Sequence, residues 1–244
     1  MTFNNHLIGG IPVEITRKKN IKNLYIRVAP PQGEVVVSSP NTCTDEEIKF
    51  YVLKRLPDIM AARERMKSQI RQSPREYVSG ESHYLWGKSY MLQVIKEGKK
   101  YIIKQVPNKI IFTVPEDATR ESKERAFNEW YRRDLKRVLS NIVKPIEQKI
   151  GVSANEYCIK NMKTKWGTCN IEKRRIWINL QLAKKPIECL EYIITHELLH
   201  LIEKNHTHKF YALVEKYYPT WKEAQKKLEQ MPLDYLESET PTLS

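Results

Sequence analysis

The segment from Leu190 to His208 constrains the fold more than any other part of the sequence. Its apolar residues recur at the i, i+3, i+4 spacing of a buried helix face, which leaves His196, Glu197 and His200 on another face. At about 100° and 1.5 Å per residue, the two histidines lie roughly 40° and one turn apart, so both imidazoles can reach one metal ion. The segment therefore predicts a buried helix that presents three polar groups to a cleft.

The H-E-x-x-H pattern from His196 to His200 is typical of zinc hydrolases. In such sites both histidines bind Zn²⁺, and the glutamate accepts a proton from the water that the metal polarises. The histidine and acidic content of this chain produces the pattern by chance in roughly one such sequence in a hundred. On a helix with a buried apolar face, the pattern therefore indicates a metal site in preference to a solvated polar surface.

A third ligand is expected after a turn in the chain. On an unbroken helix His206 would lie about 15 Å beyond His196 and on a different face, so the helix has to end near Asn205. Asparagine tolerates the left-handed conformation that such a turn often uses. Catalytic zinc usually takes three protein ligands. His206 is the preferred third ligand, and Glu203 and His208 remain alternatives.

Four segments carry a resemblance to a known family: residues 163–169 (KTKWGTC), 176–180 (IWINL), 192–200 (YIITHELLH) and 205–210 (NHTHKF). In this order they resemble the YgjP-like metal-dependent hydrolases, which are relatives of the SprT-like and WLM zinc metallopeptidases. The resemblance is specific over residues 157–221. It implies that His196, His200 and His206 bind zinc and that Glu197 is the catalytic acid/base. No cysteine follows Cys189, so the zinc ribbon of many SprT proteins is missing, which favours the YgjP-like branch.

Composition indicates a protein of the cytoplasm. A chain of 244 residues with 41% hydrophobic content can bury a full core, and it contains no stretch that predicts a membrane span. The first ten residues lack the basic start and apolar run of a secretory signal. The four cysteines form no C-x-x-C pair, which fits a reducing compartment and small core residues better than disulfides or metal ligands.

The formal net charge of +13, from 42 basic and 29 acidic side chains, makes nucleic acid a candidate partner. Solvated helix faces and strand edges explain the same excess. Only basic clusters that converge on one surface would make the nucleic-acid interpretation strong. The clusters are Arg17–Lys19, Arg63–Arg75, Lys96–Lys104, Arg132–Arg137 and Lys160–Arg175.

The pattern along the chain predicts an α+β fold. Strands are expected at residues 11–17, 24–29, 35–39, 82–86, 90–96, 101–106, 109–114, 157–165 and 174–180. A helical stretch over residues 44–70 should be split by Pro57, and a long helix over residues 118–150 should bend at Pro145 and stop at Gly151. Pro186 should begin the metal-site helix, and Thr207 should cap the next one.

These elements predict a β-rich N-terminal region with a helical insertion (1–116), a minimal zincin-like catalytic core (117–231) and a flexible tail (232–244). No internal repeat is evident in the sequence. Trp166 and Gly167 are interpreted as a structural corner beneath the metal-site helix. Lys163 and Lys165 alternate on one strand face, toward either an acidic substrate or solvent.

Three classes of function fit these features. The first is a zinc metallopeptidase with protein or peptide substrates, some of them associated with DNA, in which the strand Arg174–Leu180 aligns an extended peptide. The second is a zinc-dependent nucleoside triphosphate pyrophosphohydrolase, although no P-loop is present. The third is a DNA-binding protein with a relic site, against which the intact H-E-x-x-H pattern argues. The sequence does not determine the substrate, the cleavage specificity or the oligomeric state.

Overall fold

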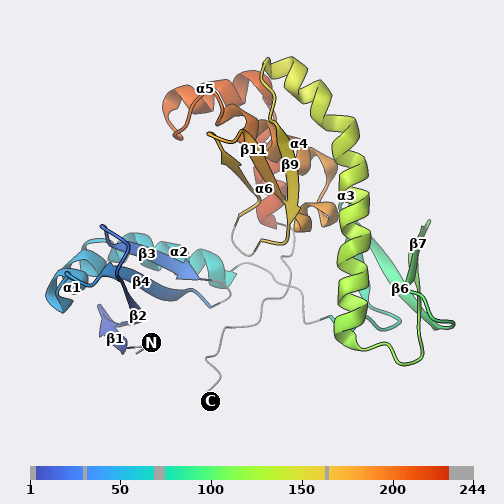
Figure 1. Cartoon of the computed structure of the whole chain (residues 1–244), viewed down its shortest axis with the longest axis horizontal. Coiled ribbons are helices and arrows are strands. Elements are labelled where there is room, and N and C mark those ends of the chain that lie inside the picture. Colours follow the sequence, from blue (N-terminus) through green and yellow to red (C-terminus); the bar gives the residue numbers. More distant parts are fainter. Residues whose placement is uncertain (1–3, 30–31, 69–74, 163–164, 231–244) are drawn as a thin grey trace. The chain divides into compact units, whose positions relative to one another are not determined.

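The computed structural model describes residues 4–29, 32–68, 75–162 and 165–230 (Figure 1). Contacts between residues divide the chain into two compact units, one within residues 1–71 and the other within residues 72–234. The elements give the α+β composition that the sequence predicts. Lys163 and the expected tail at residues 232–244 lie outside the described residues. No helix of the described residues is both long and apolar enough to cross a bilayer.

The first unit is a four-stranded sheet covered by two helices. Its strands are β1 (Asn4–Ile8), β2 (Ile11–Lys18), β3 (Tyr25–Ala29) and β4 (Glu34–Pro40), in the order β1-β2-β4-β3. The inner pair, β2 and β4, is parallel, and the outer pairs are antiparallel. Helices α1 (Asp45–Lys54) and α2 (Leu56–Ser68) follow, with Pro57 in the first turn of α2, which confirms the predicted split. Strand β1 was not predicted.

Alternation along the strands buries one face of this sheet. Val13 and Val37 are fully buried against Ile48 and Val52 of α1. Residues between them on the strands are only half-buried or exposed, as expected when one face of an antiparallel-rich sheet meets a helix layer and the other does not.

The second unit begins with a sheet of the same size. Its strands are β5 (Ser82–Leu85), β6 (Lys88–Lys96), β7 (Ile102–Val106) and β8 (Lys109–Val114), in the order β5-β6-β8-β7. Helix α3 (Arg120–Ile150) packs on it through Phe127, whose ring lies 5.0 Å from that of Phe112 on β8. Pro145 lies inside α3, whose axis bends toward its C-terminal end in Figure 1, and Gly151 ends the helix in the left-handed conformation, as predicted.

The rest of the second unit is a three-stranded sheet with helices. The strands β9 (Glu156–Lys160), β10 (Gly167–Asn170) and β11 (Arg175–Asn179) have the order β10-β11-β9. The turn η1 (Leu180–Lys184) leads to helices α4 (Ile187–Leu199), α5 (His208–Tyr217) and α6 (Trp221–Gln230). Residues 167–170 were expected as a connection, and their pairing with β11 makes them a strand instead.

The hydrophobic cluster of the second unit joins both of its sheets to α3 and α4. It includes Phe112 and Phe127, which lie on either side of the domain boundary expected after residue 116, so this boundary falls inside the compact unit. The division of the chain into residues 1–116, 117–231 and 232–244 stays a prediction about domains.

Candidate metal centre

Helix α4 is the rigid support of the site. Leu190, Ile194 and Leu198 are fully buried, and the helix packs against α3, α5, α6 and the strand β10. His196 and His200 are only half-buried, since they lie on the face that points away from this packing. The helix ends at Leu199, earlier than the sequence indicated, because tight turn bonds from the amides of residues 201–203 close its last turn.

The segment after α4 returns the chain to the histidines. Asn205 does not take the left-handed conformation expected of it. Its carbonyl oxygen accepts a hydrogen bond from the amide of Thr207 (2.8 Å), and the Thr207 side chain caps α5 by accepting from the amide of Phe210 (3.3 Å). The turn therefore places His206 beside α4, and the predicted cap at Thr207 is confirmed.

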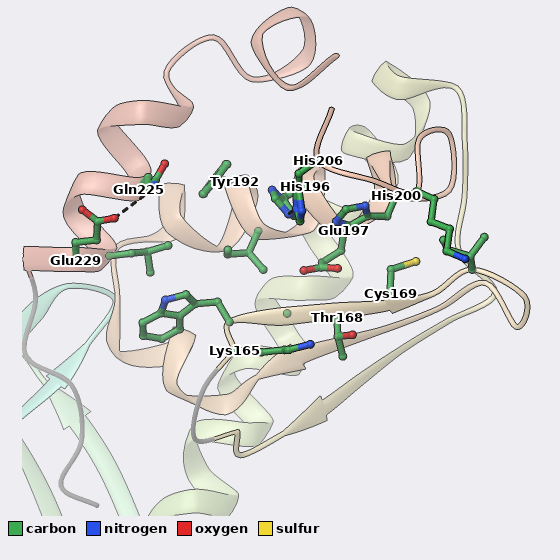
Figure 2. Close-up of a pocket in the computed structure, with 16 residues that line it drawn as sticks. Lys165, Thr168, Cys169, Tyr192, His196, Glu197, His200, His206, Gln225 and Glu229 are labelled. Carbon is green, nitrogen blue, oxygen red and sulfur yellow. Dashed lines mark hydrogen bonds between the residues drawn. The ribbon is translucent and has the colours of Figure 1, made fainter. Parts of the chain in front are cut away.

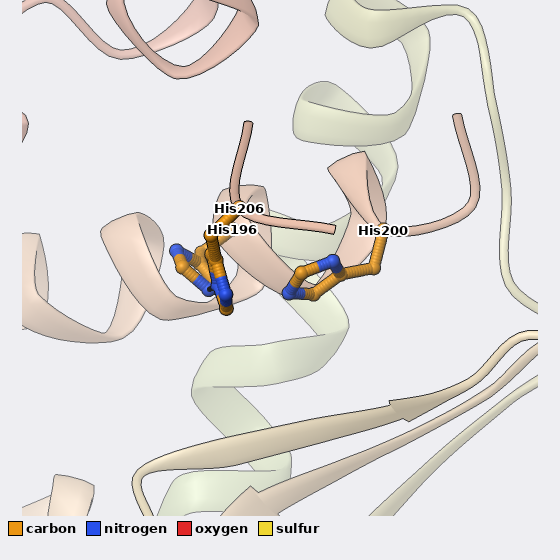
Figure 3. Close-up of side chains that lie close together, drawn as sticks. All are labelled: His196, His200 and His206. Carbon is orange, nitrogen blue, oxygen red and sulfur yellow. Dashed lines mark hydrogen bonds between the residues drawn. The ribbon is translucent and has the colours of Figure 1, made fainter. Parts of the chain in front are cut away.

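Three imidazoles converge where the sequence predicted a metal site. One nitrogen from each of His196, His200 and His206 lies within 4.8 Å of the other two (Figure 3). The Nε2 atoms of His196 and His206 are 2.9 Å apart, and the ring centres of His200 and His206 are 4.7 Å apart. Three imidazole nitrogens on one side of a cavity fit the ligand set of a catalytic divalent metal, which usually takes three protein ligands.

The two alternative ligands do not join this cluster. His208 is exposed in the first turn of α5. The backbone oxygen of Glu203 lies 3.2 Å from Nδ1 of His200, whereas its carboxylate lies near the amide of Asn205. A hydrogen bond from Nδ1 to a carbonyl fixes the ring and leaves Nε2 free to bind a metal. Glu203 thus orients a candidate ligand in place of being one.

Phe210 forms an apolar support behind the three imidazoles. It is fully buried, and its ring centre lies 4.9, 4.6 and 4.8 Å from those of His196, His200 and His206. Burial, followed by the neighbouring His200 and His206, lowers the pKa of His196 to about 4. Burial also lowers the pKa of His200. The imidazoles of His196 and His200 are therefore held neutral, which is the form that binds a metal.

Glu197 is buried next to the cluster and packs on a glycine. Its side chain is 6% exposed, and burial raises its pKa to about 7, against the opposing charge of Lys165. A Cβ atom on Gly167 would lie 2.8 Å from both Cγ and Oε1 of Glu197. Any larger residue at position 167 would displace the carboxylate. The sequence placed Gly167 in a structural corner but gave no sign of this contact.

These groups line a cavity of about 570 Å³ between α4, α6 and β10 (Figure 2). Cys169 lies in its wall, and burial, followed by the charge of Glu197, raises the pKa of the thiol to about 11. Cys169 is therefore a protonated wall residue and is not part of the three-histidine group. The cavity lining also includes Lys165 and Lys204.

Asn179 organises the segment that leads into β10. It is 3% exposed, and its side-chain Nδ2 donates to the backbone oxygens of Met162 (2.9 Å) and Lys165 (2.7 Å). Its Oδ1 accepts from the amide of Gln181 at the start of η1. The half-buried Trp166 packs on the main cluster, in agreement with a structural corner, although it also contributes to the cavity wall. The sequence signals for Asn179 were its place as a polar residue in the predicted strand 174–180 and in the IWINL segment of the family resemblance.

Comparison with known proteins gives a family but no curated relative. No curated protein matches the chain. Two solved zymogens of archaeal metallopeptidases match part of it. Abylysin of Pyrococcus abyssi is 20% identical over 39% of this chain and 98% of its own, with a TM-score of 0.35. Jannalysin of Methanocaldococcus jannaschii is 27% identical over 37% of this chain and 92% of its own, with a TM-score of 0.34. At such TM-scores the likeness supports no inference about this chain.

The family model of the YgjP-like metallopeptidase domain matches residues 22–231. This match covers most of the chain, from the segment before β3 to the end of α6, and includes every residue of the three-histidine cavity. The protein belongs to the YgjP-like metallopeptidase family.

Proposed function

We propose that the protein is a zinc-dependent peptidase in which His196, His200 and His206 bind the metal and Glu197 is the general base. The observation that carries this proposal is the convergence of three imidazole nitrogens within 4.8 Å beside a buried carboxylate. Nitrogen donors of this number suit Zn²⁺ better than Mg²⁺ or Ca²⁺, which prefer oxygen ligands.

The chain's own groups divide the chemistry between them. Zinc, when bound, supplies a Lewis acid that acidifies water and polarises a carbonyl group. Glu197 accepts the proton of the attacking water, since burial brings the pKa of its carboxyl to about 7. The same carboxyl then passes the proton to the leaving amine. The missing side chain of Gly167 leaves the space at the start of β10 that the Glu197 carboxylate occupies.

An extended substrate is aligned by β10. The sequence pointed to Arg174–Leu180 for this role, but that assignment is wrong because β11 pairs with strands on both sides. In the described sheet β10 is an edge strand, and Gly167, Thr168 and Cys169 line the cavity. An added peptide strand would gain backbone hydrogen bonds at this edge without much side-chain selectivity.

Metal analysis of purified variants tests the ligand assignment. His206→Ala should lose bound zinc, as measured by mass spectrometry of metals, because only two of three ligands remain. His208→Ala is the matched control, since His208 is close in sequence but exposed outside the cluster, and it should retain zinc. Equal retention by both variants would remove His206 from the site.

Peptide-library profiling tests the activity and the role of Glu197. The zinc-loaded wild type should produce cleavages that a Glu197→Gln variant with the same zinc content does not, and the rate should fall by at least about 100-fold. Undiminished cleavage by the variant would contradict the general-base role. An empty profile from the zinc-loaded wild type would contradict a peptidase active on peptides alone.

A nucleoside triphosphate pyrophosphohydrolase is the second candidate, because Lys165 and Lys204 line the same cavity and suit a polyphosphate. Pyrophosphate release from nucleoside triphosphates, lost in Glu197→Gln, would support it.

For the peptidase, proteins associated with DNA are the proposed targets on the basis of the +13 charge. Faster cleavage of a DNA-bound protein than of the same protein free, at low salt only, is the expected result. The cytoplasm remains the proposed location.

A further inference from the structure

The cavity extends from the three histidines to α6, the last described helix. Trp166, Ile193, Leu228 and Glu229 line this end. Figure 2 shows Glu229 at the edge of the cavity farthest from His200. The proposed metal site therefore has a built space to one side of it, large enough to receive a substrate side chain.

This end of the cavity combines apolar walls with one carboxylate. Leu228 and Ile193 are 4% and 6% exposed, so their side chains are held by the surrounding core where they line the cavity. Gln225 Nε2 donates to Glu229 Oε1 (3.2 Å) one turn apart on α6, and both side chains are exposed at the rim of the cavity. A long methylene stem that ends in a cation matches such a surface, since the stem packs on the walls and the cation pairs with the carboxylate.

The charge at the opposite end has the other sign. Lys204 lines the cavity beyond the histidines, and Lys165 lies near Glu197. Lys185 is buried, with Nζ 5.6 Å from the ring centre of Trp166. The Trp166 ring therefore already has a cation partner within the protein, and it offers a substrate only apolar contact. Lys185 does not line the cavity, whereas Glu229 and Lys204 do, so a basic side chain is favoured at the α6 end and disfavoured at the Lys204 end.

The direction of β10 relates these ends to the direction of a substrate. The strand starts at Gly167, which contacts Ile193 and Glu197, and runs toward Ile171 at the other end of the cavity. Antiparallel pairing is the more stable arrangement per residue. A peptide that pairs antiparallel with β10 then passes the metal site and reaches Glu229 with the residues that follow the cleaved bond.

On the basis of the proposed peptidase function, we infer that Glu229 is a specificity-determining residue that selects substrates with Lys or Arg on the C-terminal side of the cleaved bond. The inference rests on the position of its carboxylate at the end of an apolar-walled cavity and on Lys204, which lines the cavity near His200. It names a substrate class that the three histidines and Glu197 do not determine.

Peptide binding in a Glu197→Gln background tests this inference without turnover. The probes are short fluorescein-labelled peptides of one Ala/Val background, with Lys in the C-terminal half, Glu in the C-terminal half, or Lys in the N-terminal half. Fluorescence anisotropy should show the first peptide binding about fivefold more tightly than either of the others, as a partly exposed ion pair gives. Glu229→Gln should equalise the first two, and Glu229→Lys should favour the Glu peptide.

Glu223→Gln is the control, because Glu223 is an exposed carboxylate on the same helix that does not line the cavity, and it should keep the wild-type preference. A preference that survives Glu229→Gln, or that favours Lys in the N-terminal half, would overturn the inference. A zinc-loaded wild type that binds with this preference but cleaves no peptide would refute the peptidase proposal and leave the role of Glu229 intact.

Discussion

The two four-stranded sheets of the molecule share one design. Both have the same strand order, with a parallel inner pair and antiparallel outer pairs. In each, the first hairpin turns through two residues of positive φ, Gly9-Gly10 and Trp86-Gly87. Each last strand is followed by a helix whose N-cap is a threonine, Thr44 in one and Thr119 in the other. The structure therefore contains a repeat of architecture that the sequence did not reveal.

The two sheets differ in what their first turn contacts. In the second sheet, the amides of Trp86 and Gly87 donate to the backbone oxygens of Ala183 (2.8 Å) and Lys184 (3.2 Å), in the turn η1 that precedes α4. A Cβ atom on Gly10 of the first sheet would meet nothing within 4 Å. The second copy thus supports the metal-site helix, whereas the matching turn of the first copy has open space at Gly10.

Replacing each of the two matching glycines, Gly10 and Gly87, with alanine should give the largest difference in stability between the two sheets. Gly10→Ala adds only the strain of a positive φ, about 1 kcal/mol. Gly87→Ala adds the same strain, and its Cβ would also lie 2.7 Å from Cγ of Pro186, so we expect about 4 kcal/mol. Urea unfolding measures both. Equal losses would show that the contact with Pro186 is relieved without cost.

Tryptophan fluorescence makes this measurement specific to one unit. All five tryptophans belong to the second unit: Trp86, Trp130, Trp166, Trp177 and Trp221. Far-UV circular dichroism reports both units. Gly87→Ala should therefore move the fluorescence transition, and Gly10→Ala should be visible in the circular dichroism.

A histidine four positions before each of these glycines gives the next contrast. His83 is 4% exposed. Burial, together with Arg75 and Lys184 and against the opposing effect of Glu81, lowers the pKa of its imidazole to about 4. Between pH 6.5 and pH 4 the unfolded chain binds a proton that the folded chain does not. The contribution of neutral His83 to the free energy of unfolding of the second unit is therefore fully present above pH 6.5. It falls by about 3 kcal/mol as the pH drops to 4.

His83→Gln should remove this acid-dependent loss, as measured by fluorescence-detected unfolding between pH 4 and pH 7. His6→Gln, at the matching position of the first sheet, is the control and should leave the fluorescence transition of the second unit unchanged. If His83→Gln loses as much stability in acid as the wild type, other groups carry the pH dependence.

Gly167→Ala tests whether the space beside Gly167 positions the Glu197 carboxylate. The new methyl group would lie 2.8 Å from Cγ and Oε1 of Glu197 and would therefore displace the carboxylate. We expect kcat to fall about 100-fold, or about 2.7 kcal/mol in the barrier, while bound zinc is retained. Loss of zinc together with activity would instead indicate a general distortion of α4.

The sequence predicted the parts of the structure that follow from periodicity and from local turn signals. The apolar stripe around His196, Glu197 and His200 defined a buried helix, and the proline and glycine signals placed the breaks near Pro57 and Gly151 correctly. Such features depend on residues close together in the chain. Helix geometry favoured His206 over Glu203 and His208 as the third ligand, the family resemblance implied the same residue, and the structure brings it within reach of the other two histidines.

The features that the sequence missed depend on distant contacts or on short elements without an apolar pattern. Strand β10 has the sequence Gly-Thr-Cys-Asn and is a strand only because β11 pairs with it. The contact between Gly167 and Glu197 joins residues thirty positions apart. The repeat of architecture is hidden because a sheet requires alternation and turns, which different side chains satisfy equally well.

The two helix caps give the smallest contrast, and they test whether the units unfold independently. Thr44 and Thr119 each accept a hydrogen bond, from the amides of Glu47 (3.2 Å) and Ser122 (3.2 Å) respectively. Replacing either with alanine should cost about 1 kcal/mol. Each unit has its own hydrophobic cluster. Thr119→Ala should therefore shift the fluorescence transition, and Thr44→Ala should shift only the circular dichroism. A fluorescence shift of equal size in Thr44→Ala would show that both copies of the sheet unfold as one cooperative structure.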